Sequence, residues 1–176
     1  MMDTLGLLVD KGLSGDALDS VLTDLITKDE FDDDDDKRCC IALAWNRSRG
    51  NKGNPTDIEV EGDDTVSVDG DEFAMLTDDD ADQACADYIR ESVWSFRPEF
   101  LSGVTCIDQS VFEALADKCE DANDEVRSII DGSCGMDDFV ESAISADGRG
   151  PFLASYDSEE HEFCDDNDDV WYFYQR

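Results

Sequence analysis

Residues 58–96 read IEVEGDDTVSVDGDEFAMLTDDDADQACADYIRESVWSF, and this stretch decides the expected fold class. In its first half, residues 58–61 and 66–68 alternate apolar with polar side chains, with a turn at 62–64 and a third candidate segment at 72–76. Alternation at a period of two is typical of half-buried strands, so these segments predict a small antiparallel meander. The second half changes to helical spacing of its apolar residues. We therefore expect an α+β fold, with several amphipathic helices packed on one face of a small antiparallel sheet.

Three helices are predicted from residue 77 onwards. Thr77 suits the N-cap of the first helix, the three aspartates after it lie favourably against the helix dipole, and Pro98 ends or kinks the helix. The second helix spans 110–131 and begins with Ser110 and Glu113 as a capping box. A third, shorter helix covers 136–145. The inner face expected for the second helix consists of Val111, Phe112, Leu115, Cys119, Ala122, Val126, Ile129 and Ile130.

The N-terminal region, residues 1–36, is predicted as a helical hairpin followed by an acidic loop. Two short helices within 4–27 flank the sequence GLSG, and the five consecutive aspartates at 32–36 repel one another, which favours a mobile loop. Residues 37–176 then form an α+β core domain, or the whole chain forms one continuous domain. The hairpin is not a DNA reader, because its exposed positions are Asp16, Asp19 and Asp24 instead of lysine or arginine.

The C-terminal region is predicted to end in two strands, at 151–156 and 170–174, joined by an acidic loop over 158–169. The only histidine of the chain, His161, falls in this loop. A hydrolase with a Ser–His or Cys–His pair would have to use it. A zinc site built on His161 and Cys164 lacks further spaced ligands, since no C-x-x-C motif occurs. We interpret His161 as a solvated loop residue, with metal ligation and catalysis as the alternatives.

Residues 37–52 interrupt the acidic pattern. They contain Lys37, Arg38, Arg47, Arg49 and Lys52, and no acidic residue. One interpretation of such a cluster is a phosphate site. A better one is internal counter-charge, which docks against acidic neighbours and relieves the self-repulsion of the chain.

Charge is the dominant property of the chain, which carries 47 acidic and 13 basic residues and a formal net charge of −34. Such a charge destabilises the compact state by self-repulsion, so either the solvent requires it or a partner recognises it. The patterns of an EF-hand and of a phosphate-binding loop are both incomplete. We therefore predict a protein that is not an enzyme, has no catalytic residues, and uses neither a cofactor nor a specific metal ion.

The seven cysteines are odd in number and scattered, which indicates reduced thiols in a cytosolic protein instead of a disulfide framework. The N-terminus lacks the basic and apolar regions of a signal peptide, and no run of 18 apolar residues occurs. An acidic protein is also repelled by anionic lipid headgroups. These features predict a cytoplasmic protein that does not engage membranes, and they specify no oligomeric state.

Two stretches resemble a family of small acidic phage and prophage accessory proteins. The first is FAMLTDDDAD at 73–82, followed by Tyr88-Ile89, SVWSF at 92–96 and Phe100-Leu101. The second is DGRGPFLASYD at 147–157, followed by Glu159-Glu160 and a C-terminal Tyr-Phe-Tyr segment. The resemblance covers roughly residues 70–176 and consists of fold signatures without established catalytic residues. It implies a viral or mobile-element origin, and accessory phage proteins often counter host defences.

The first functional hypothesis is a DNA-mimicking inhibitor. Carboxylates at i, i+3 and i+4 on a helix have Cβ atoms about 5–6 Å apart, which is similar to the coarse spacing of DNA phosphates. Such a surface can occupy the basic groove of a host restriction enzyme, CRISPR effector or other nuclease, without binding nucleic acid itself. The residues predicted to form this acidic face are Asp78, Asp79, Asp82, Asp87, Glu113, Asp117, Glu120, Asp121, Asp124 and Asp131.

The alternative hypotheses give the charge another purpose. Low lysine content and an excess of aspartate fit a halophile-adapted protein of unrelated function, because high salt screens self-repulsion. An acidic binding module for another basic partner, a virion component and a metal-dependent enzyme with unrecognised ligands also remain open. An uneven distribution of acids favours mimicry, whereas a halophile spreads them.

Overall fold

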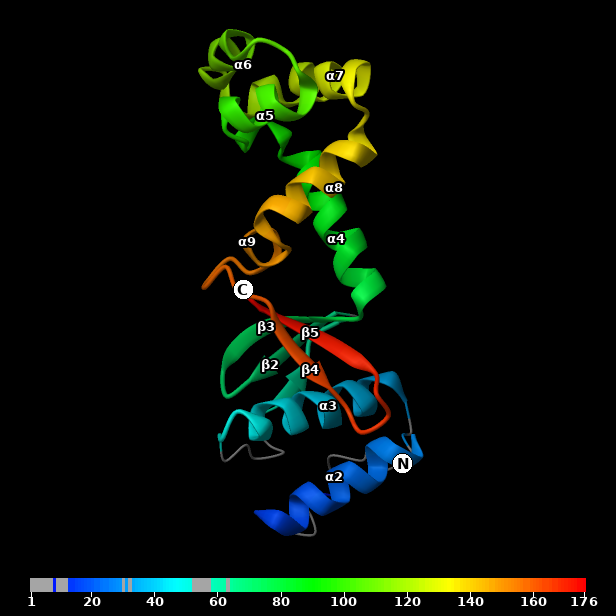
Figure 1. Ribbon diagram of the computed structural model, residues 1–176. Helices are drawn as coiled ribbons and strands as arrows, with labels where there is room; N and C mark the ends of the chain where they lie inside the picture. The colour runs from blue at the N-terminus through cyan, green and yellow to red at the C-terminus, as the bar shows by residue number, and fades with distance from the viewer. Residues whose placement is uncertain (1–7, 9–12, 30, 32, 52–57, 63) are drawn as a thin grey trace. The chain divides into compact units, whose positions relative to one another are not determined.

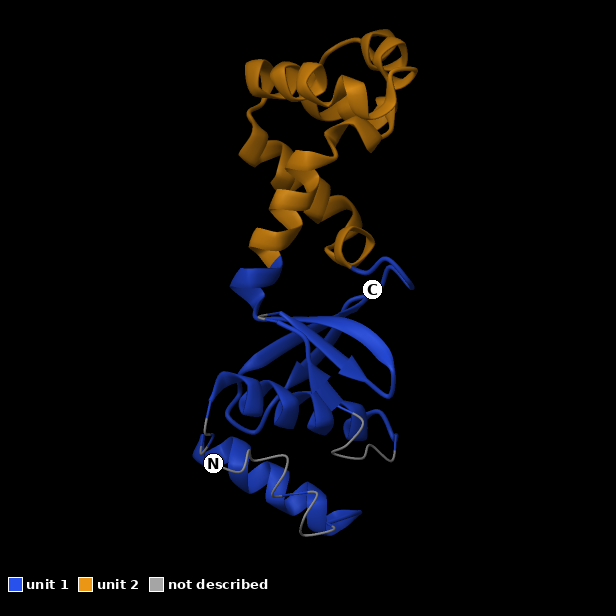
Figure 2. Cartoon of the chain, turned by 180° about the vertical axis from the view of Figure 1, so that it is seen from behind, with its two compact units in different colours: residues 1–81, 154–176 blue, residues 82–153 orange. Residues whose placement is uncertain are grey.

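A computed structural model describes residues 8, 13–29, 31, 33–51, 58–62 and 64–176. These residues form helices and one five-stranded antiparallel sheet, which confirms the predicted α+β fold (Figure 1). The chain divides into two compact units (Figure 2). Unit 1 consists of Met1–Ala81 and Ala154–Arg176, and unit 2 of Asp82–Leu153. This division differs from the predicted boundary at residue 36, because the N-terminal helix shares the core of unit 1 with the sheet.

The sheet of unit 1 has the strand order β1-β2-β3-β5-β4, and every pairing is antiparallel. Its strands are β1 (Ile58–Val60), β2 (Thr65–Val68), β3 (Asp71–Leu76), β4 (His161–Cys164) and β5 (Val170–Gln175). The predicted meander of the first three strands is confirmed, and so is the last strand. Strand β4 lies where an acidic loop was predicted. Its pairing with β5 supplies backbone hydrogen bonds, which the local sequence pattern does not indicate.

In the described part of unit 1, helices α2 and α3 lie on one side of the sheet (Figure 1). Helix α3 (Asp34–Ser48) packs directly on the strands, and α2 (Asp16–Lys28) packs on α3. The core combines Leu18, Leu22 and Ile26 of α2 with α3 residues such as Ile41 and Trp45. From the sheet it includes Ile58, Val66, Val68, Phe73, Met75 and Phe173.

The aspartate run at the start of α3 corrects the prediction of a mobile acidic loop. Asp33 is the N-cap, and its side chain accepts a hydrogen bond of 2.9 Å from the backbone N–H of Asp36. Asp34, Asp35 and Asp36 occupy the first helical turn, where the exposed N–H groups and the helix dipole favour negative charge. The same repulsion that suggested a loop is thus offset by a helix start. Most of the first helix of the predicted hairpin lies outside the described residues.

Unit 2 is helical, and α4 (Asp78–Glu91) enters it from unit 1. Thr77 caps α4 as predicted, since its hydroxyl accepts a 3.3 Å hydrogen bond from the N–H of Asp80. Next come η2 (Val93–Ser95) and α5 (Pro98–Thr105), where Pro98 begins a helix at a position that needs no N–H donor. Helix α8 (Met136–Asp147) confirms the third predicted helix. The short α9 (Gly150–Leu153) stands where a strand was predicted, so that prediction was wrong.

The predicted continuous helix over 110–131 is also wrong. The segment folds as α6 (Gln109–Ala116), η3 (Cys119–Ala122) and α7 (Asn123–Ser133), and Cys119 has a left-handed φ of 53° at the break. The cap of α6 is Asp108, which accepts a 3.0 Å hydrogen bond from the N–H of Ser110, so the proposed capping box does not form. The break lets Phe112 of α6 and Ile130 of α7 reach one core, whereas Val111 and Cys119 become exposed.

Candidate protein-binding surfaces

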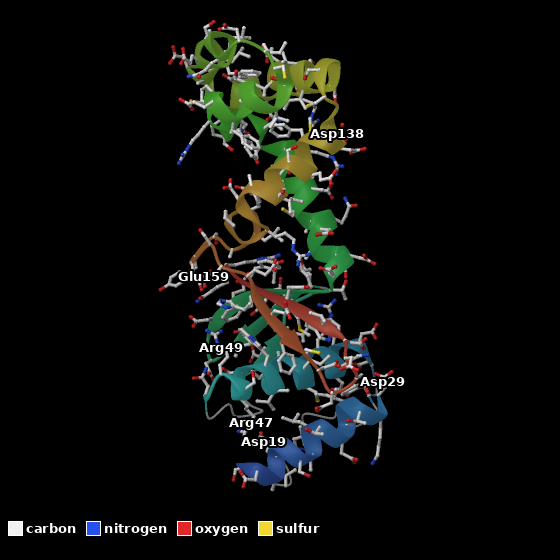
Figure 3. The ribbon with its side chains drawn as sticks, viewed as in Figure 1. Asp19, Asp29, Arg47, Arg49, Asp138 and Glu159 are labelled. Atoms are coloured by element: carbon white, nitrogen blue, oxygen red, sulfur yellow. The ribbon has the colours of Figure 1, made fainter. Side chains whose placement is uncertain are left out.

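The cations of the protein mostly contact its own chain. In unit 1, Lys37 pairs with Asp29 at 2.9 Å. Arg47 pairs with Asp19, and both residues are labelled in Figure 3. In the same unit Arg38 donates to the Met75 carbonyl at 3.2 Å, and the Arg49 guanidinium lies 4.8 Å from the centre of the Trp45 ring. The interpretation of residues 37–52 as internal counter-charge is therefore confirmed for Lys37 and Arg47, whereas Lys52 lies outside the described residues.

Unit 2 uses its cations in the same way. Arg90 pairs with Asp137 at 2.9 Å and with Asp87 at 3.3 Å, and Arg149 pairs with Asp82 at 3.0 Å. Lys118 pairs with Glu125 at 3.3 Å, and Arg127 donates to the carbonyl of Arg90. Because these pairs are internal, the surplus carboxylates of each unit dominate its outward charge.

Many of the surplus acids of unit 1 lie on its strands and on the turns and loops that flank them. Residues 53–81 contain eleven acidic side chains and residues 154–175 contain eight, and neither stretch contains lysine or arginine. These two stretches supply all five strands, and the pairing of β3 with β5 brings them together. We call their exposed members the acidic sheet surface. It comprises Glu59, Glu61, Asp69, Asp71, Glu72, Asp78, Asp79, Asp80, Glu159, Glu160, Glu162, Asp166, Asp168 and Asp169.

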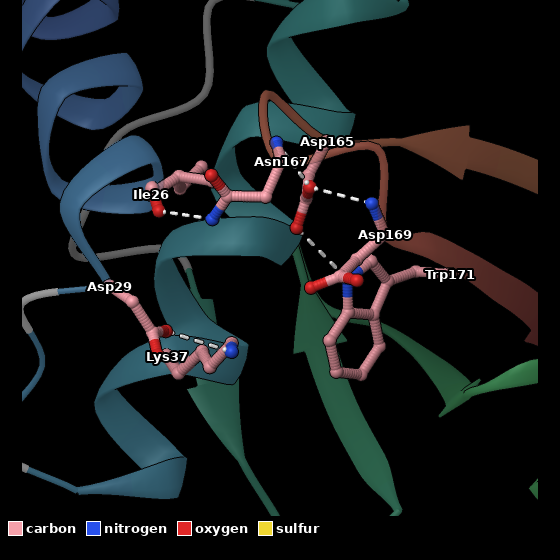
Figure 4. A network of polar contacts seen from close by, with 7 residues as sticks. All are labelled: Ile26, Asp29, Lys37, Asp165, Asn167, Asp169 and Trp171. Atoms are coloured by element: carbon pink, nitrogen blue, oxygen red, sulfur yellow. Dashed lines mark hydrogen bonds and ion pairs between the residues drawn. The ribbon is translucent and has the colours of Figure 1, made fainter.

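The loop between β4 and β5 is held by a buried carboxylate (Figure 4). Asp165 is only 6% exposed, and it accepts hydrogen bonds from the N–H of Asn167 at 2.8 Å, the N–H of Asp169 at 3.1 Å and the Trp171 indole at 3.3 Å. The Asn167 amide in turn donates to the Ile26 carbonyl of α2 at 2.6 Å. This network fixes the loop in one conformation, with Asp166, Asp168 and Asp169 exposed to solvent.

The negative charges of this loop affect the pKa values of neighbouring side chains. The pKa of Lys37 is raised, mainly by its hydrogen bond to Asp29 and also by the charges of Asp169 and Asp165. The pKa of the nearby Cys164 thiol is raised as well, by desolvation and by four neighbouring carboxylates. The charges of Asp165 and Asp169 contribute to both shifts in the same sense, because a negative potential stabilises cations and disfavours a further anion.

The ten residues of the predicted acidic face are all exposed, but they are spread over more elements than the two helices that were predicted to carry them. Asp78 and Asp79 lie in the first turn of α4 within unit 1, and Asp82 and Asp87 continue along the same helix in unit 2. Glu113 lies on α6, and Asp117 is its C-cap residue. Glu120 and Asp121 lie on η3, and Asp124 and Asp131 on α7. Asp82 and Asp87 are already paired with Arg149 and Arg90. Sequence reasoning missed the strand carboxylates, although the absence of lysine and arginine from 53–81 signals them.

An apolar groove lies between α6 and α7. It has a volume of about 630 Å³ and is lined by Val111, Ala114 and Leu115 from α6 and by Asp124, Glu125, Ser128 and Ile129 from α7. The break at Cys119 creates this groove, because a straight helix would carry both apolar rows on a single convex face. Residues 113–125 around it contain six acidic side chains and one basic side chain.

His161 is not the solvated loop residue that was predicted. It begins β4, its side chain is 19% exposed, and its Nε2 lies 3.0 Å from a carboxylate oxygen of Asp157. Within the described residues, Asp157, Glu159 and His161 are the one group whose ligand atoms, all within 4.8 Å of one another, can hold a metal ion. Imidazole with two carboxylates suits a first-row divalent cation. The same contacts also serve as an ordinary internal pair, with the His161 ring 6.2 Å from that of Trp45.

All seven cysteines are described, and none is disulfide-bonded. Cys39, Cys40 and Cys85 are buried. Burial, reinforced by Cys39 and Asp36, raises the pKa of Cys40 to about 12. Since the thiolate is the reactive form, this buried thiol is a poor nucleophile.

Comparisons of the chain with family models, with curated proteins and with solved structures found no match. The resemblance to phage accessory proteins therefore stays a prediction. Each helix in the described part of the chain is too short or too polar to cross a membrane.

Proposed function

We propose that this protein is a non-catalytic acidic inhibitor, which mimics DNA and occupies the nucleic-acid-binding groove of a basic host protein such as a restriction or CRISPR nuclease. In this proposal it acts in the cytoplasm of the host cell, by steric and electrostatic occlusion without chemistry. The single observation that carries the proposal is the acidic sheet surface, whose fourteen exposed carboxylates come from two stretches that contain no lysine or arginine.

Charge distribution supports mimicry over a uniform halophilic surface. Unit 1 carries 31 acidic and 8 basic residues, a charge of −23, whereas unit 2 carries 16 and 5, a charge of −11. Within unit 1, the two stretches that supply the strands and their connecting turns, 53–81 and 154–175, contain no lysine or arginine, so they are more acidic than the unit as a whole. Complementary charge steers a basic partner towards such a surface and makes the association salt-dependent.

A pull-down from bacterial lysate tests this function. Three baits are compared: the wild-type chain, a variant of the acidic sheet surface with Glu59, Glu72 and Glu162 changed to glutamine, and a control with three exposed acids of unit 2, Glu91, Asp138 and Glu141, changed to their amides. The proposal predicts capture of a nucleic-acid-binding enzyme that duplex DNA displaces and that the sheet variant retains less well. Equal recovery of scattered basic proteins by all three baits, without displacement by DNA, would refute it.

A further inference from the structure

The groove between α6 and α7 differs from the acidic sheet surface because it offers apolar contact as well as charge. Val111 is 39% exposed, Ala114 is exposed, and Leu115 and Ile129 are half-buried, although all four are apolar. Exposed apolar side chains that line a concave surface indicate a binding site more often than scattered ones do. The volume of about 630 Å³ accommodates several side chains of a partner.

The rim of the groove is acidic. Asp124 and Glu125 line it directly, and Asp117, Glu120 and Asp121 are exposed on the turn that joins α6 to α7. Lys118 is the cation of this turn, and it is paired with Glu125 at 3.3 Å. The hydrogen bond from its own backbone N–H, and then the pair with Lys118, lower the pKa of Glu125, so its carboxylate is charged at neutral pH. An occupant therefore meets an apolar floor between negative charges.

We propose that this groove binds an amphipathic basic helix of the partner, with apolar side chains at i, i+3 or i+4 in the groove and lysines or arginines over the acidic rim. The inference rests on the proposed function, because it takes the helix to belong to the basic protein that the acidic surface attracts. A helix lying in an apolar groove is a recurring mode of recognition. Apolar anchors supply affinity that salt does not remove, whereas the rim charges supply orientation and rate.

Charge also decides against the other occupants of an apolar groove. A second copy of this chain carries the same net charge of −34 and would place like charges on either side of the contact. An anionic lipid surface is repelled for the same reason. A cationic, partly apolar segment is the occupant that fits both parts of the groove, because its apolar side chains match the floor and its positive charge complements the rim.

A designed peptide tests the groove without knowledge of the natural partner. The probe is a dye-labelled leucine/lysine peptide of about 18 residues, or five helical turns, with its leucines at helical spacing. A peptide of the same composition with its leucines scrambled serves as the reference. Binding is measured by fluorescence anisotropy at about 0.15 M salt, where exposed charges are partly screened.

Two substitutions on α6 distinguish binding in the groove from nonspecific attraction to the acidic surface. Ala114→Trp fills the groove, whereas Ala116→Trp adds the same bulk at an exposed position of α6 that does not line it. Neither residue belongs to the core, and circular dichroism verifies that both variants fold. We expect Ala114→Trp to weaken binding of the helical peptide by about tenfold or more and Ala116→Trp by less than about twofold. The scrambled peptide should bind the three proteins equally.

The outcomes separate this inference from the proposed function. If both variants bind the helical peptide as the wild type does, or if the peptide does not bind, the groove proposal is overturned, and a DNA-displaced partner in the pull-down would still support mimicry. If Ala114→Trp alone loses binding, the groove is supported. Failure of the pull-down in that case would remove DNA mimicry but leave a site for a basic helix.

Discussion

The indole ring of Trp45 stacks on the phenyl ring of Phe173, with ring centroids 4.0 Å apart and ring planes inclined by 2°. Trp45 belongs to α3 and Phe173 to β5, so the contact joins the N-terminal half of unit 1 to the last strand of the chain. Phe73 of β3 meets the same indole edge-on at 5.0 Å. The core of unit 1 thus requires both segments that flank unit 2 in the sequence.

Removal of this stack should destabilise unit 1 strongly. Phe173→Ala deletes a fully buried aromatic ring, and we expect a loss of about 3–5 kcal/mol in the free energy of unfolding. In unit 2, Phe112→Ala should lose a similar amount, whereas Leu115→Ala should lose less, because Leu115 is only half-buried beside the groove. Urea denaturation followed by circular dichroism measures all three. A Phe173→Ala protein as stable as the wild type would contradict the described core.

Asp165 should stabilise the protein despite its charge. Asp165→Ala leaves the N–H groups of Asn167 and Asp169 and the Trp171 indole without their acceptor, so we expect a loss of about 2–3 kcal/mol. Asp166→Asn is the matched control, since Asp166 is exposed on the same loop and its neutralisation relieves repulsion. Hydrogen exchange of the 165–169 amides should accelerate in Asp165→Ala alone. Equal stability of the two variants would remove the structural role of Asp165.

The ion pair of Asp19 with Arg47 should make stability depend on pH in the acid range. The hydrogen bond that Asp19 accepts from Arg47 lowers the pKa of Asp19 below the ordinary value of 3.8, although burial acts in the opposite direction. A lowered folded-state pKa stabilises the protein above the unfolded value, and this stabilisation disappears as the pH falls below 3.8 through the folded value. Asp19→Asn should therefore be less stable than the wild type at pH 7, and the difference should vanish in strong acid.

The control for this titration is Asp121→Asn, which removes one exposed carboxylate from unit 2 and reports the general relief of self-repulsion. Urea midpoints of the three proteins from pH 7 downwards supply the comparison. If Asp19→Asn behaves as Asp121→Asn does across the range, the pair with Arg47 does not contribute.

Salt should act in opposite directions on folding and on binding. With a net charge of −34, screening by added salt should raise the urea midpoint, because the Debye length shortens from about 10 Å at 0.1 M to about 3 Å at 1 M. The internal ion pairs let us expect a folded chain already at low salt. Partner binding should weaken over the same series. A chain that folds only in molar salt would instead favour the halophilic alternative.

Charge reversal should identify the unit that meets the partner. Glu120, Asp121 and Asp124 changed to lysine should weaken binding and retain helicity, apart from a loss of about 0.3–1 kcal/mol for a cation in the first turn of α7. The same charge change at Glu59, Glu72 and Glu162 tests the acidic sheet surface. Isothermal titration against the captured partner compares the two variants. Unchanged affinity in both would exclude both surfaces.

Local patterns predicted the elements whose stability is local. The alternation at 58–76 and at 170–174 and the helical spacing at 136–145 all appear in the structure, and Thr77 caps α4. Patterns failed where a longer-range contact decides the conformation. The acidic segment around His161 becomes a strand because β5 lies beside it. The start of α3 is a different case, since the aspartates at 33–36 are stabilised locally, by the N-cap and the N-terminus of their own helix.

The sequence by itself determined the α+β class, the excess of negative charge, and the absence of lysine and arginine from 53–81 and 154–175. Only the tertiary structure decided that these two stretches become neighbours, because the β3–β5 pairing joins segments that are distant in the chain. It also decided that the helical pattern at 110–131 bends at Cys119, which brings Phe112 and Ile130 into one core, whereas a straight helix would hold them about 27 Å apart along its axis. Periodicity describes one element at a time, whereas burial is settled among all of them together.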